Sequence, residues 1–257
     1  MNTTVAAIRR YPVKGLSGQD LPAVDLTAGQ AIPLDRRYGL LHGPAALDTE
    51  SDGWRLPSDF FTLDRTEKLA ALDTLFDEDT QSLIIRRGGR QVSRGRLDQP
   101  MGRTLLEQFF AAYLAGIVPG MPRLVDAKDG GSFGDTEEPS LLLLNRASLR
   151  DVEERIAKQP IDPRRMRANL LLDGLAPWAE RAWIGRELTV GGATLRVIEA
   201  VECRPANNVN PDSGVADLAL GPIMERGYGH AHIALRARVI ADGRIALGDR
   251  VELTEGN

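Results

Sequence analysis

Short apolar runs, each ended within a few residues by glycine, proline or aspartate, follow one another along most of this sequence. A run of about four to eight alternating residues between turn-forming residues is typical of a β-strand and too short for most helices. Val5–Tyr11 and Leu21–Leu26 have this pattern, and similar runs continue to about residue 97. Ser82–Ile85 and the run that begins at Gln91 flank Arg87-Gly-Gly-Arg90, which predicts a hairpin. We therefore expect the N-terminal part of the chain to be mainly β.

Two segments have the period of a helix instead. Apolar residues recur every three or four positions between Gly102 and Gly116, which predicts an amphipathic helix that ends at Gly116. Ser148-Leu-Arg-Asp151 has the form of a capping box, a serine followed three positions later by an acidic residue. This predicts that a second helix begins at the serine. Pro160 and Pro163 mark its end, because proline interrupts a helix.

The last third of the chain returns to strand-like runs. Residues 187–190 and 193–201 flank Gly191-Gly192, and residues 230–240 and 244–253 flank Asp242-Gly243, so we predict two hairpins. The sequence as a whole therefore predicts a mainly β protein with a few helices, in the α+β class. At 257 residues the chain is long enough for two domains, and the change in pattern places their boundary between residues 95 and 120.

The composition argues against several classes of function. Asp and Glu number 36 against 32 Lys and Arg, so a general nucleic-acid-binding protein is not expected. Cys203 is the single cysteine, which excludes a disulfide within the chain, a multi-thiolate zinc site and an iron–sulfur cluster. The first ten residues lack a signal-peptide pattern, and the apolar runs are too short to span a bilayer. We therefore expect a cytoplasmic protein whose partners include neither nucleic acid nor membrane.

Three basic clusters stand out in this acidic chain. Residues 9–18 combine three basic side chains with a glycine-rich turn, Asp35-Arg36-Arg37-Tyr38 forms the second cluster, and Asp162–Asn169 forms the third. Glycine lets backbone N–H groups approach an oxyanion, and Lys and Arg add charge and hydrogen-bond donors. Together the clusters could form a cradle for a phosphate group. The alternative is that these arginines are solvated surface charges, or partners of the neighbouring acids.

Cys203 and two histidines are the other side chains with potential chemistry. Cys203 lies between a strand-like run and a long polar loop, beside Arg204. A thiol in such a place can be a metal ligand or a nucleophile, and the alternative is a buried, inert cysteine. His230 and His232 would share one face of a strand, but no third ligand is evident, and we assign no metal to them.

Several segments, in their order along the chain, resemble the MOSC family, named for the C-terminal domain of molybdenum cofactor sulfurase. Tyr11-Pro-Val-Lys-Gly15 and Leu34–Tyr38 are similar to the N-terminal β-barrel domain that often precedes MOSC. The segments that resemble the MOSC core are residues 133–135, 141–145, 162–170, 183–185, 209–214, 228–230 and 248–249. The two-domain form is similar to the mitochondrial amidoxime-reducing component and its bacterial relatives. The resemblance implies an N-terminal MOSC-associated β-barrel domain over residues 1–100 and a MOSC domain with a β-barrel core over residues 101–257.

The resemblance also implies a cofactor and the residues that hold it. Relatives of this architecture bind the molybdopterin form of the molybdenum cofactor between the two domains. Lys14 falls on the lysine of the Tyr-Pro-Val-Lys motif that contacts the cofactor phosphate, and Arg167 and Asn169 fall on an Arg-Phe-Arg-Pro-Asn motif. Cys203 is the predicted catalytic residue, as the thiolate ligand of molybdenum. The predicted cofactor-binding residues are Lys14, Gly15, Arg36, Arg37, Arg167, Asn169, Arg204 and Asn208.

The sequence departs from the family pattern near the metal. The usual order is Arg-Cys, two residues, and then Thr-Asn-Val-Asp-Pro. Counting back from Val209 without a gap puts Arg204 in the place of the ligand cysteine, with Cys203 one residue early, and Asn210 replaces the aspartate. Either the loop carries a one-residue insertion and Cys203 still reaches the metal, or the thiolate ligand is lost. A one-residue step along a strand turns a side chain to the opposite face.

Three functions are compatible with this sequence. The first is a molybdenum-dependent oxidoreductase that reduces the N–O bond of N-hydroxylated small molecules, with electrons from a separate donor protein. The second is a non-redox protein that binds molybdopterin or another phosphorylated small molecule, or one that carries sulfur as a persulfide on Cys203. The third is an anion-binding enzyme unrelated to molybdenum, for which pyridoxal phosphate is the obvious candidate, because a lysine near the phosphate cradle could form a Schiff base.

Overall fold

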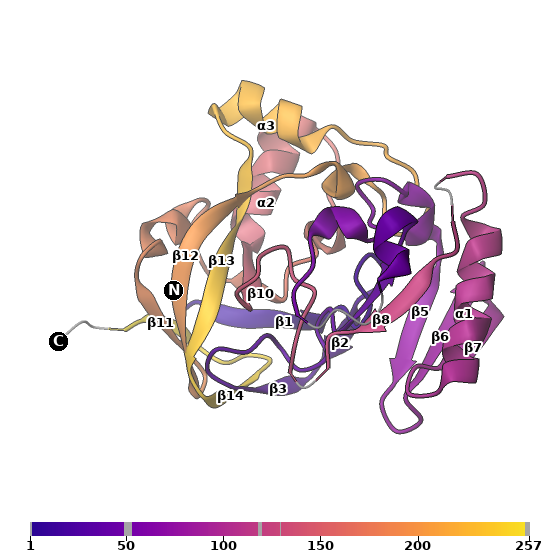
Figure 1. Ribbon diagram of the computed structural model, residues 1–257. Helices are drawn as coiled ribbons and strands as arrows, with labels where there is room; N and C mark the ends of the chain where they lie inside the picture. The colour runs from indigo at the N-terminus through magenta and orange to yellow at the C-terminus, as the bar shows by residue number, and fades with distance from the viewer. Residues whose placement is uncertain (1, 49–52, 118–119, 129, 255–257) are drawn as a thin grey trace.

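A curled sheet of eight strands organises most of the molecule (Figure 1). The computed structural model describes residues 2–48, 53–117, 120–128 and 130–254. The sheet has the order β15-β11-β12-β13-β9-β10-β1-β2, in which β9 and β10 are parallel and the other neighbours antiparallel. Its strands are β1 (Thr4–Arg10), β2 (Gln19–Leu21), β9 (Leu141–Asn145), β10 (Leu170–Asp173), β11 (Glu187–Val190), β12 (Ala193–Glu202), β13 (His232–Ala241) and β15 (Val251–Leu253).

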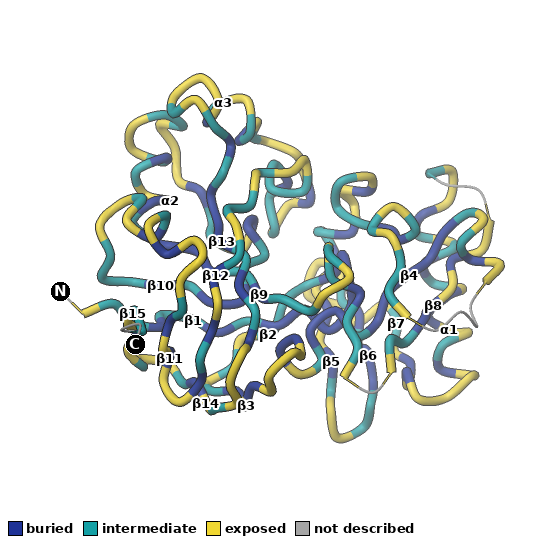
Figure 2. The backbone as a smooth tube through the Cα atoms, turned by 60° about the vertical axis from the view of Figure 1, so that its left-hand side comes forward, coloured by how far each residue is buried: buried dark blue, intermediate teal, exposed yellow. Residues whose placement is uncertain are grey.

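β15, at one edge of this sheet, meets β1, the strand next to the opposite edge, so the curl is barrel-like. The Val5 N–H donates to the Asp249 carbonyl at 2.9 Å, and the Val251 N–H donates to the Thr3 carbonyl at 2.9 Å. The inner face is filled by aliphatic side chains such as Ile8, Leu170 and Leu195, which are fully buried. Buried positions alternate with more exposed ones along β11 and the first half of β12, and Figure 2 shows buried stretches throughout the sheet. The predicted fold class, mainly β with a few helices around a barrel core, is confirmed.

Strands from the first 26 residues belong to the same structure as the C-terminal strands. β1 pairs with β10, and β3 (Ala23–Leu26) pairs with β14 (Gly243–Ala246). The division at residue 100 stays a prediction, and these pairings run across it.

The remaining N-terminal residues build a second cluster of strands beside the barrel. β4 (Tyr38–Leu41) pairs with β8 (Arg123–Asp126), and β5 (Asp73–Asp77), β6 (Ser82–Arg87) and β7 (Arg90–Arg96) form an antiparallel meander. The predicted hairpin at Arg87-Gly-Gly-Arg90 is confirmed as the β6–β7 turn.

Helix α1 (Pro100–Tyr113) covers the meander as its apolar period predicts, with Leu106 and Phe110 fully buried. It packs closely on β7 because both partners have glycine at the contact. A Cβ atom on Gly95 would lie 2.3 Å from the Gly102 carbonyl oxygen. Helices α2 (Arg146–Val152), continued by a π-helical turn at Glu153–Ala157, and α3 (Leu220–Tyr228) pack together outside the barrel.

Two sequence predictions about local structure are wrong. Ser148 does not cap a helix, because α2 begins earlier, and the Asn145 side chain accepts the Ala147 N–H at 3.0 Å as its cap. Ser148 instead lies inside α2, buried, and donates to Glu180 at 2.6 Å. β13 and β14 do not form a hairpin either, since β14 pairs with β3. There the Asp242 carboxylate accepts the Ala28 N–H at 2.7 Å, which directs the chain away from β13.

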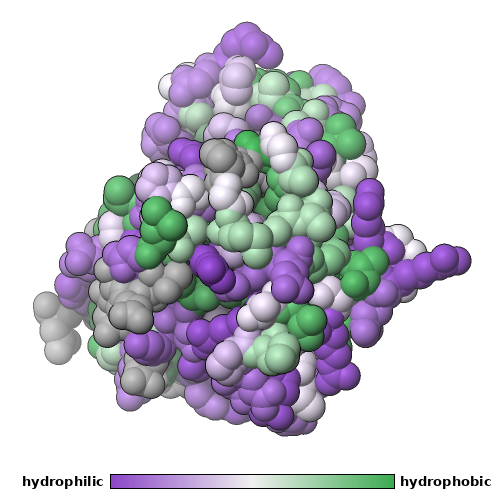
Figure 3. Space-filling view, turned by 45° about the vertical axis from the view of Figure 1, so that its right-hand side comes forward, coloured by the Kyte–Doolittle hydropathy of each residue, from purple (hydrophilic) through white to green (hydrophobic). Residues whose placement is uncertain are grey.

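On the face shown in Figure 3, hydrophilic residues surround smaller patches of hydrophobic ones. None of the helices in the described part of the chain has the length and apolar character needed to cross a membrane.

Candidate functional site

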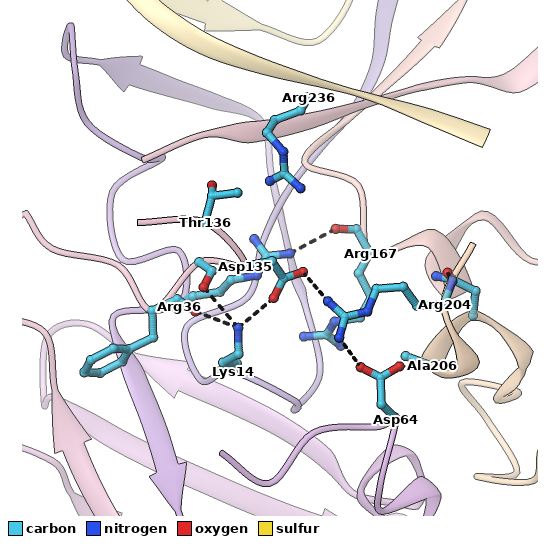
Figure 4. A network of polar contacts seen from close by, with 12 residues as sticks. Lys14, Arg36, Asp64, Asp135, Thr136, Arg167, Arg204, Ala206 and Arg236 are labelled. Carbon is cyan, nitrogen blue, oxygen red and sulfur yellow. Dashed lines mark hydrogen bonds and ion pairs between the residues drawn. The ribbon is translucent and has the colours of Figure 1, made fainter. Parts of the chain in front are cut away.

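A narrow cleft of about 80 Å³ lies between the end of β12 and the segments that follow β1 and β3. Basic side chains from all parts of the chain reach it, together with two carboxylates from separate loops. The charged residues that line the cleft are Lys14, Arg36, Asp64, Asp135, Arg167, Glu202 and Arg204. Figure 4 shows the side chains of most of these residues directed toward one another. The three basic clusters of the sequence therefore contribute one side chain each to one site.

Lys14 is held at the bottom of the cleft by the turn that follows β1. Its backbone N–H donates to the Tyr38 carbonyl at 2.8 Å, next to β4. The side chain is 5% exposed, and Nζ donates to Phe133 O at 2.8 Å, Gly134 O at 3.3 Å and Asp135 Oδ1 at 2.7 Å. Burial lowers the pKa of Lys14, and the neighbouring Asp135 opposes this effect. An ammonium group has three N–H donors, so all three have acceptors within the protein.

Gly15 lines the cleft as backbone, at a positive φ of 86°. A Cβ atom there would lie 2.7 Å from the Phe61 carbonyl oxygen, so a larger residue would push the turn away from its neighbour.

Arg36 and Arg167 both have a left-handed backbone, with φ of 53° and 51°. This conformation costs about 1–2 kcal/mol for a residue other than glycine, and such residues gather at functional sites. The Arg36 guanidinium forms an ion pair with Asp35 and donates to the Arg167 carbonyl at 3.3 Å. Burial opposes the charge of Arg36, but Asp35 and Asp135 outweigh it and raise its pKa.

Arg167 brings a buried donor to the cleft that no acceptor among the described residues uses. Its guanidinium stacks on the Tyr11 ring at 4.1 Å from the centroid, and Nη1 donates to the Leu16 carbonyl at 2.8 Å. Nη2 is buried and has no hydrogen-bond partner in the described part of the chain. Burial lowers the pKa of Arg167 to about 10, which still leaves the side chain charged at neutral pH. A buried, charged and unpartnered donor is costly, and an anion bound beside it would remove that cost.

Arg204 joins the two sides of the cleft. Nη2 lies 2.8 Å from Asp64 Oδ2, and Nη1 lies 3.6 Å from Asp135 Oδ2. Asp64 also accepts the Ala206 N–H at 2.8 Å, which ties its loop to the segment after β12.

Neither Asp64 nor Asp135 is among the site residues predicted from the sequence. Asp135 lies in the Phe133-Gly134-Asp135 segment that resembles the family, and this was a signal that could have found it. Nothing in the sequence distinguishes Asp64 from other turn aspartates.

Cys203 points away from the cleft, into the apolar cluster between the barrel and α3. Its Sγ lies 3.5 Å from the Met224 sulfur, and its N–H donates to the Ala231 carbonyl at 2.8 Å. That hydrogen bond continues the β12–β13 ladder by one residue, so successive side chains still alternate. Cys203 therefore faces the cluster while Arg204 faces the cleft. Burial raises the pKa of the Cys203 thiol to about 12, and the charge of Glu202 adds to the rise.

Three predicted cofactor-binding side chains lie outside the cleft lining. Arg37 forms an ion pair with Asp126 at 2.8 Å. The Asn169 side chain accepts the Leu142 N–H at 3.0 Å and donates to the Arg9 carbonyl at 3.1 Å, which joins β9 to β1. The Asn208 side chain accepts the Leu220 N–H at 2.8 Å at the start of α3. Asn207, which sequence reasoning did not single out, lines the cleft instead.

The two histidines lie with their ring centroids 5.6 Å apart. His230 Nδ1 lies 2.9 Å from Arg181 Nη2 and also accepts the His232 N–H at 3.2 Å. Among the described residues, no group of three or more His, Cys, Asp or Glu side chains is placed to hold a metal ion.

A larger cavity of about 470 Å³ adjoins the cleft, and Arg167 lines both. Its wall includes the apolar side chains of Leu16, Leu63 and Leu72. Tyr11 and Arg165 also line it, and the Tyr11 hydroxyl and Arg165 Nε are further buried polar groups with no hydrogen-bond partner among the described residues. The volume is in the range of about 300–1,000 Å³ that is usual for small-molecule sites.

Comparison with known families identifies the C-terminal part of the chain. Residues 130–252 match the model of the MOSC domain family. These residues form a MOSC domain. The MOSC domain family generally binds the molybdenum cofactor. No curated protein matches the chain.

Solved structures similar to this chain include proteins from three bacteria. The YuaD protein from Bacillus subtilis is 11% identical, over 98% of this chain and 96% of its own, with a TM-score of 0.45. YiiM from Escherichia coli is 21% identical, over 46% of this chain and 55% of its own, with a TM-score of 0.34. YiiM from Geobacillus stearothermophilus is 20% identical, over 45% and 54%, with a TM-score of 0.35.

The site in this chain suits the phosphate group of a molybdenum cofactor but does not suit its metal end. The unpartnered Nη2 of Arg167 and the cations around it suit a phosphate group. The metal end requires a thiolate according to the resemblance, and Cys203 does not supply one in the cleft, because its partly buried thiol packs beside Met224 and has a raised pKa. In the structure Arg204 lines the cleft, and Cys203 is not among the lining residues.

Proposed function

We propose that this chain is a non-redox molybdopterin-binding protein that holds the phosphate group of the pterin in the cleft. The observation that carries the proposal is the buried Arg167 Nη2, for which the residues that the structure describes provide no acceptor. Lys14, Arg36 and Arg204 converge on the same cleft from three separate parts of the chain. A charge-assisted hydrogen bond to a phosphate oxygen contributes roughly 1.5–3 kcal/mol.

The adjoining cavity supports this assignment. It is large enough for an organic body of pterin size, and Arg167 lines both spaces. Arg167 would hold the phosphate with Nη2, and the cavity wall at Leu16, Leu63 and Leu72 would contact the body of the ligand. The Tyr11 hydroxyl would find an acceptor there.

The observed geometry favours binding over the other candidate functions. Molybdenum on the cofactor supplies two-electron redox chemistry when it is bound, as the predicted reduction of N–O bonds requires. Cys203 gives that chemistry no support, since it does not reach the cleft. A persulfide carrier needs an accessible thiolate, which a buried thiol with a raised pKa does not provide. A Schiff base on Lys14 needs a free neutral amine, whereas Nζ donates to three acceptors.

The test is to measure pterin and molybdenum in protein purified from a host that makes the cofactor. We expect wild-type protein to retain a phosphorylated pterin, and Arg167→Met to lose it, with affinity lower by roughly 10- to 150-fold. Cys203→Ala should retain as much pterin and molybdenum as wild type. The proposal is wrong if wild type carries no pterin. Its non-redox part is wrong if Cys203→Ala loses molybdenum that wild type holds, or if wild type reduces an amidoxime.

A further inference from the structure

Asp135 lies at the centre of the cleft and uses the donors that a bound anion would need. Its Oδ1 accepts from Lys14 Nζ at 2.7 Å, and its Oδ2 lies 3.6 Å from Arg204 Nη1 (Figure 4). Burial opposes the charge of Asp135, but Lys14, Arg36 and Arg204 outweigh it and hold its pKa well below the ordinary value. The carboxylate is therefore ionised at neutral pH and bridges cations from the two sides of the cleft.

We propose that Asp135 is a resident counter-ion that a ligand must displace, and that this competition makes the cleft selective for dianions. The inference rests on the proposed function, because it concerns the same site. A tethered carboxylate acts as a competitor at high effective concentration, in the millimolar range or above. A free monoanion that replaces it brings the same charge and pays an additional entropy of association. A dianion brings a second charge and further acceptor oxygens, which can also reach Arg167 Nη2.

The position of Asp135 allows this displacement. Its side chain is 35% exposed, whereas that of Lys14 is 5% exposed. Lys14 also keeps two backbone acceptors, Phe133 O and Gly134 O, when the carboxylate leaves. Gly134 precedes Asp135, and a Cβ atom there would meet nothing closer than 3.4 Å, so the neighbouring backbone is not crowded. The carboxylate can thus turn toward solvent without uncovering Lys14.

The test compares two anions of the same shape and different charge. Sulfate and perchlorate are both tetrahedral, and they are titrated by calorimetry at constant ionic strength into wild type, Asp135→Asn and Asp64→Asn. Asp135→Asn removes the competing charge and keeps an oxygen for Lys14. Asp64→Asn removes one charge from the same cleft but from a residue that contacts Arg204 and not Lys14. It is the matched control for a general change in potential.

We expect wild type to bind sulfate at least tenfold more tightly than perchlorate. Asp135→Asn should bind sulfate at least tenfold more tightly than wild type, and should bind perchlorate measurably. Asp64→Asn should change either affinity by less than threefold. The inference is overturned if Asp135→Asn binds sulfate no better than wild type, or if both variants gain equally.

Two further measurements separate this inference from the proposed function. If Arg167→Met loses sulfate binding while Asp135→Asn binds like wild type, the phosphate site stands and the role of Asp135 is refuted. If none of the proteins binds sulfate, both proposals fail. In wild type alone, the Asp135 carboxyl ¹³C resonance should move on addition of sulfate and stay in place with perchlorate, a test that does not depend on the folding of a variant. A resonance unmoved by bound sulfate contradicts the displacement.

Discussion

Alkylation of Cys203 provides the sharpest test of where its side chain lies. Burial among apolar residues raises the thiol pKa from 9.0 to about 12. A rise of about three pH units lowers the thiolate fraction at neutral pH by roughly a thousandfold. Iodoacetamide reacts with the thiolate, so we expect wild-type protein to be alkylated at least a thousandfold more slowly than a free cysteine. Mass spectrometry of the intact chain over time measures this rate, and unfolded protein in urea is the control.

Because the Cys203 thiol packs among apolar residues, its ionisation affects the free energy of unfolding at high pH. The folded thiol stays protonated where the unfolded one ionises, so stability falls as pH rises above about 9. At pH 10 the free energy of unfolding of wild type should be lower by about 1.4 kcal/mol for this reason, and Cys203→Ala should not show this decrease. At pH 7 the variant should lose only about 1 kcal/mol of packing. Alkylation within tenfold of the free-cysteine rate, or equal pH dependence of urea unfolding in the two proteins, would refute the orientation of Cys203.

Four further substitutions test the site and the packing around it. Arg204→Cys places a thiol in the cleft, and we expect its molybdenum content after expression in a cofactor-producing host to exceed that of wild type; an unchanged content would contradict the placement. Glu180→Ala leaves two buried donors of the α2 region unpaired, and urea unfolding should show a loss of about 2–4 kcal/mol. Gly95→Ala forces α1 away from β7 and should cost about 1–3 kcal/mol. Gly221→Ala in α3, where the nearest atom would lie 3.8 Å from the added methyl, should be neutral or stabilising.

Features set by neighbouring residues were predictable from the sequence. The apolar period of α1 and the turns of β6–β7 and β11–β12 depend on residues within a few positions of one another, and these predictions are confirmed. The pairing of β14 with β3 joins residues more than 200 positions apart. A strong Asp-Gly turn signal at residues 242–243 therefore gave way to a partner that no local pattern indicates.

The residues of the candidate site also divide into those that the sequence predicts and those whose role depends on the three-dimensional structure. Lys14, Arg36 and Arg167 were identified by residue type and by resemblance, and the structure brings them together. Asp135 reaches them from a separate loop, and its role depends on distances that the sequence does not contain. The orientation of Cys203 depended on whether the β12 ladder continues through it. One hydrogen bond to Ala231 settles that question.

The place of β1 inside the barrel has a consequence for how the chain must be made. β1 pairs with β2 a few residues later in the sequence, but its other neighbour β10 begins at Leu170, so this second edge of β1 stays open until about two thirds of the chain has been made. Pairing over such a distance is slow, and the open edges of the waiting strands are prone to associate with other chains. A fragment that starts at residue 130 would lack β1. It would contain every residue matched to the MOSC domain and still present β10 as a bare edge, which only the first ten residues of the protein can cover.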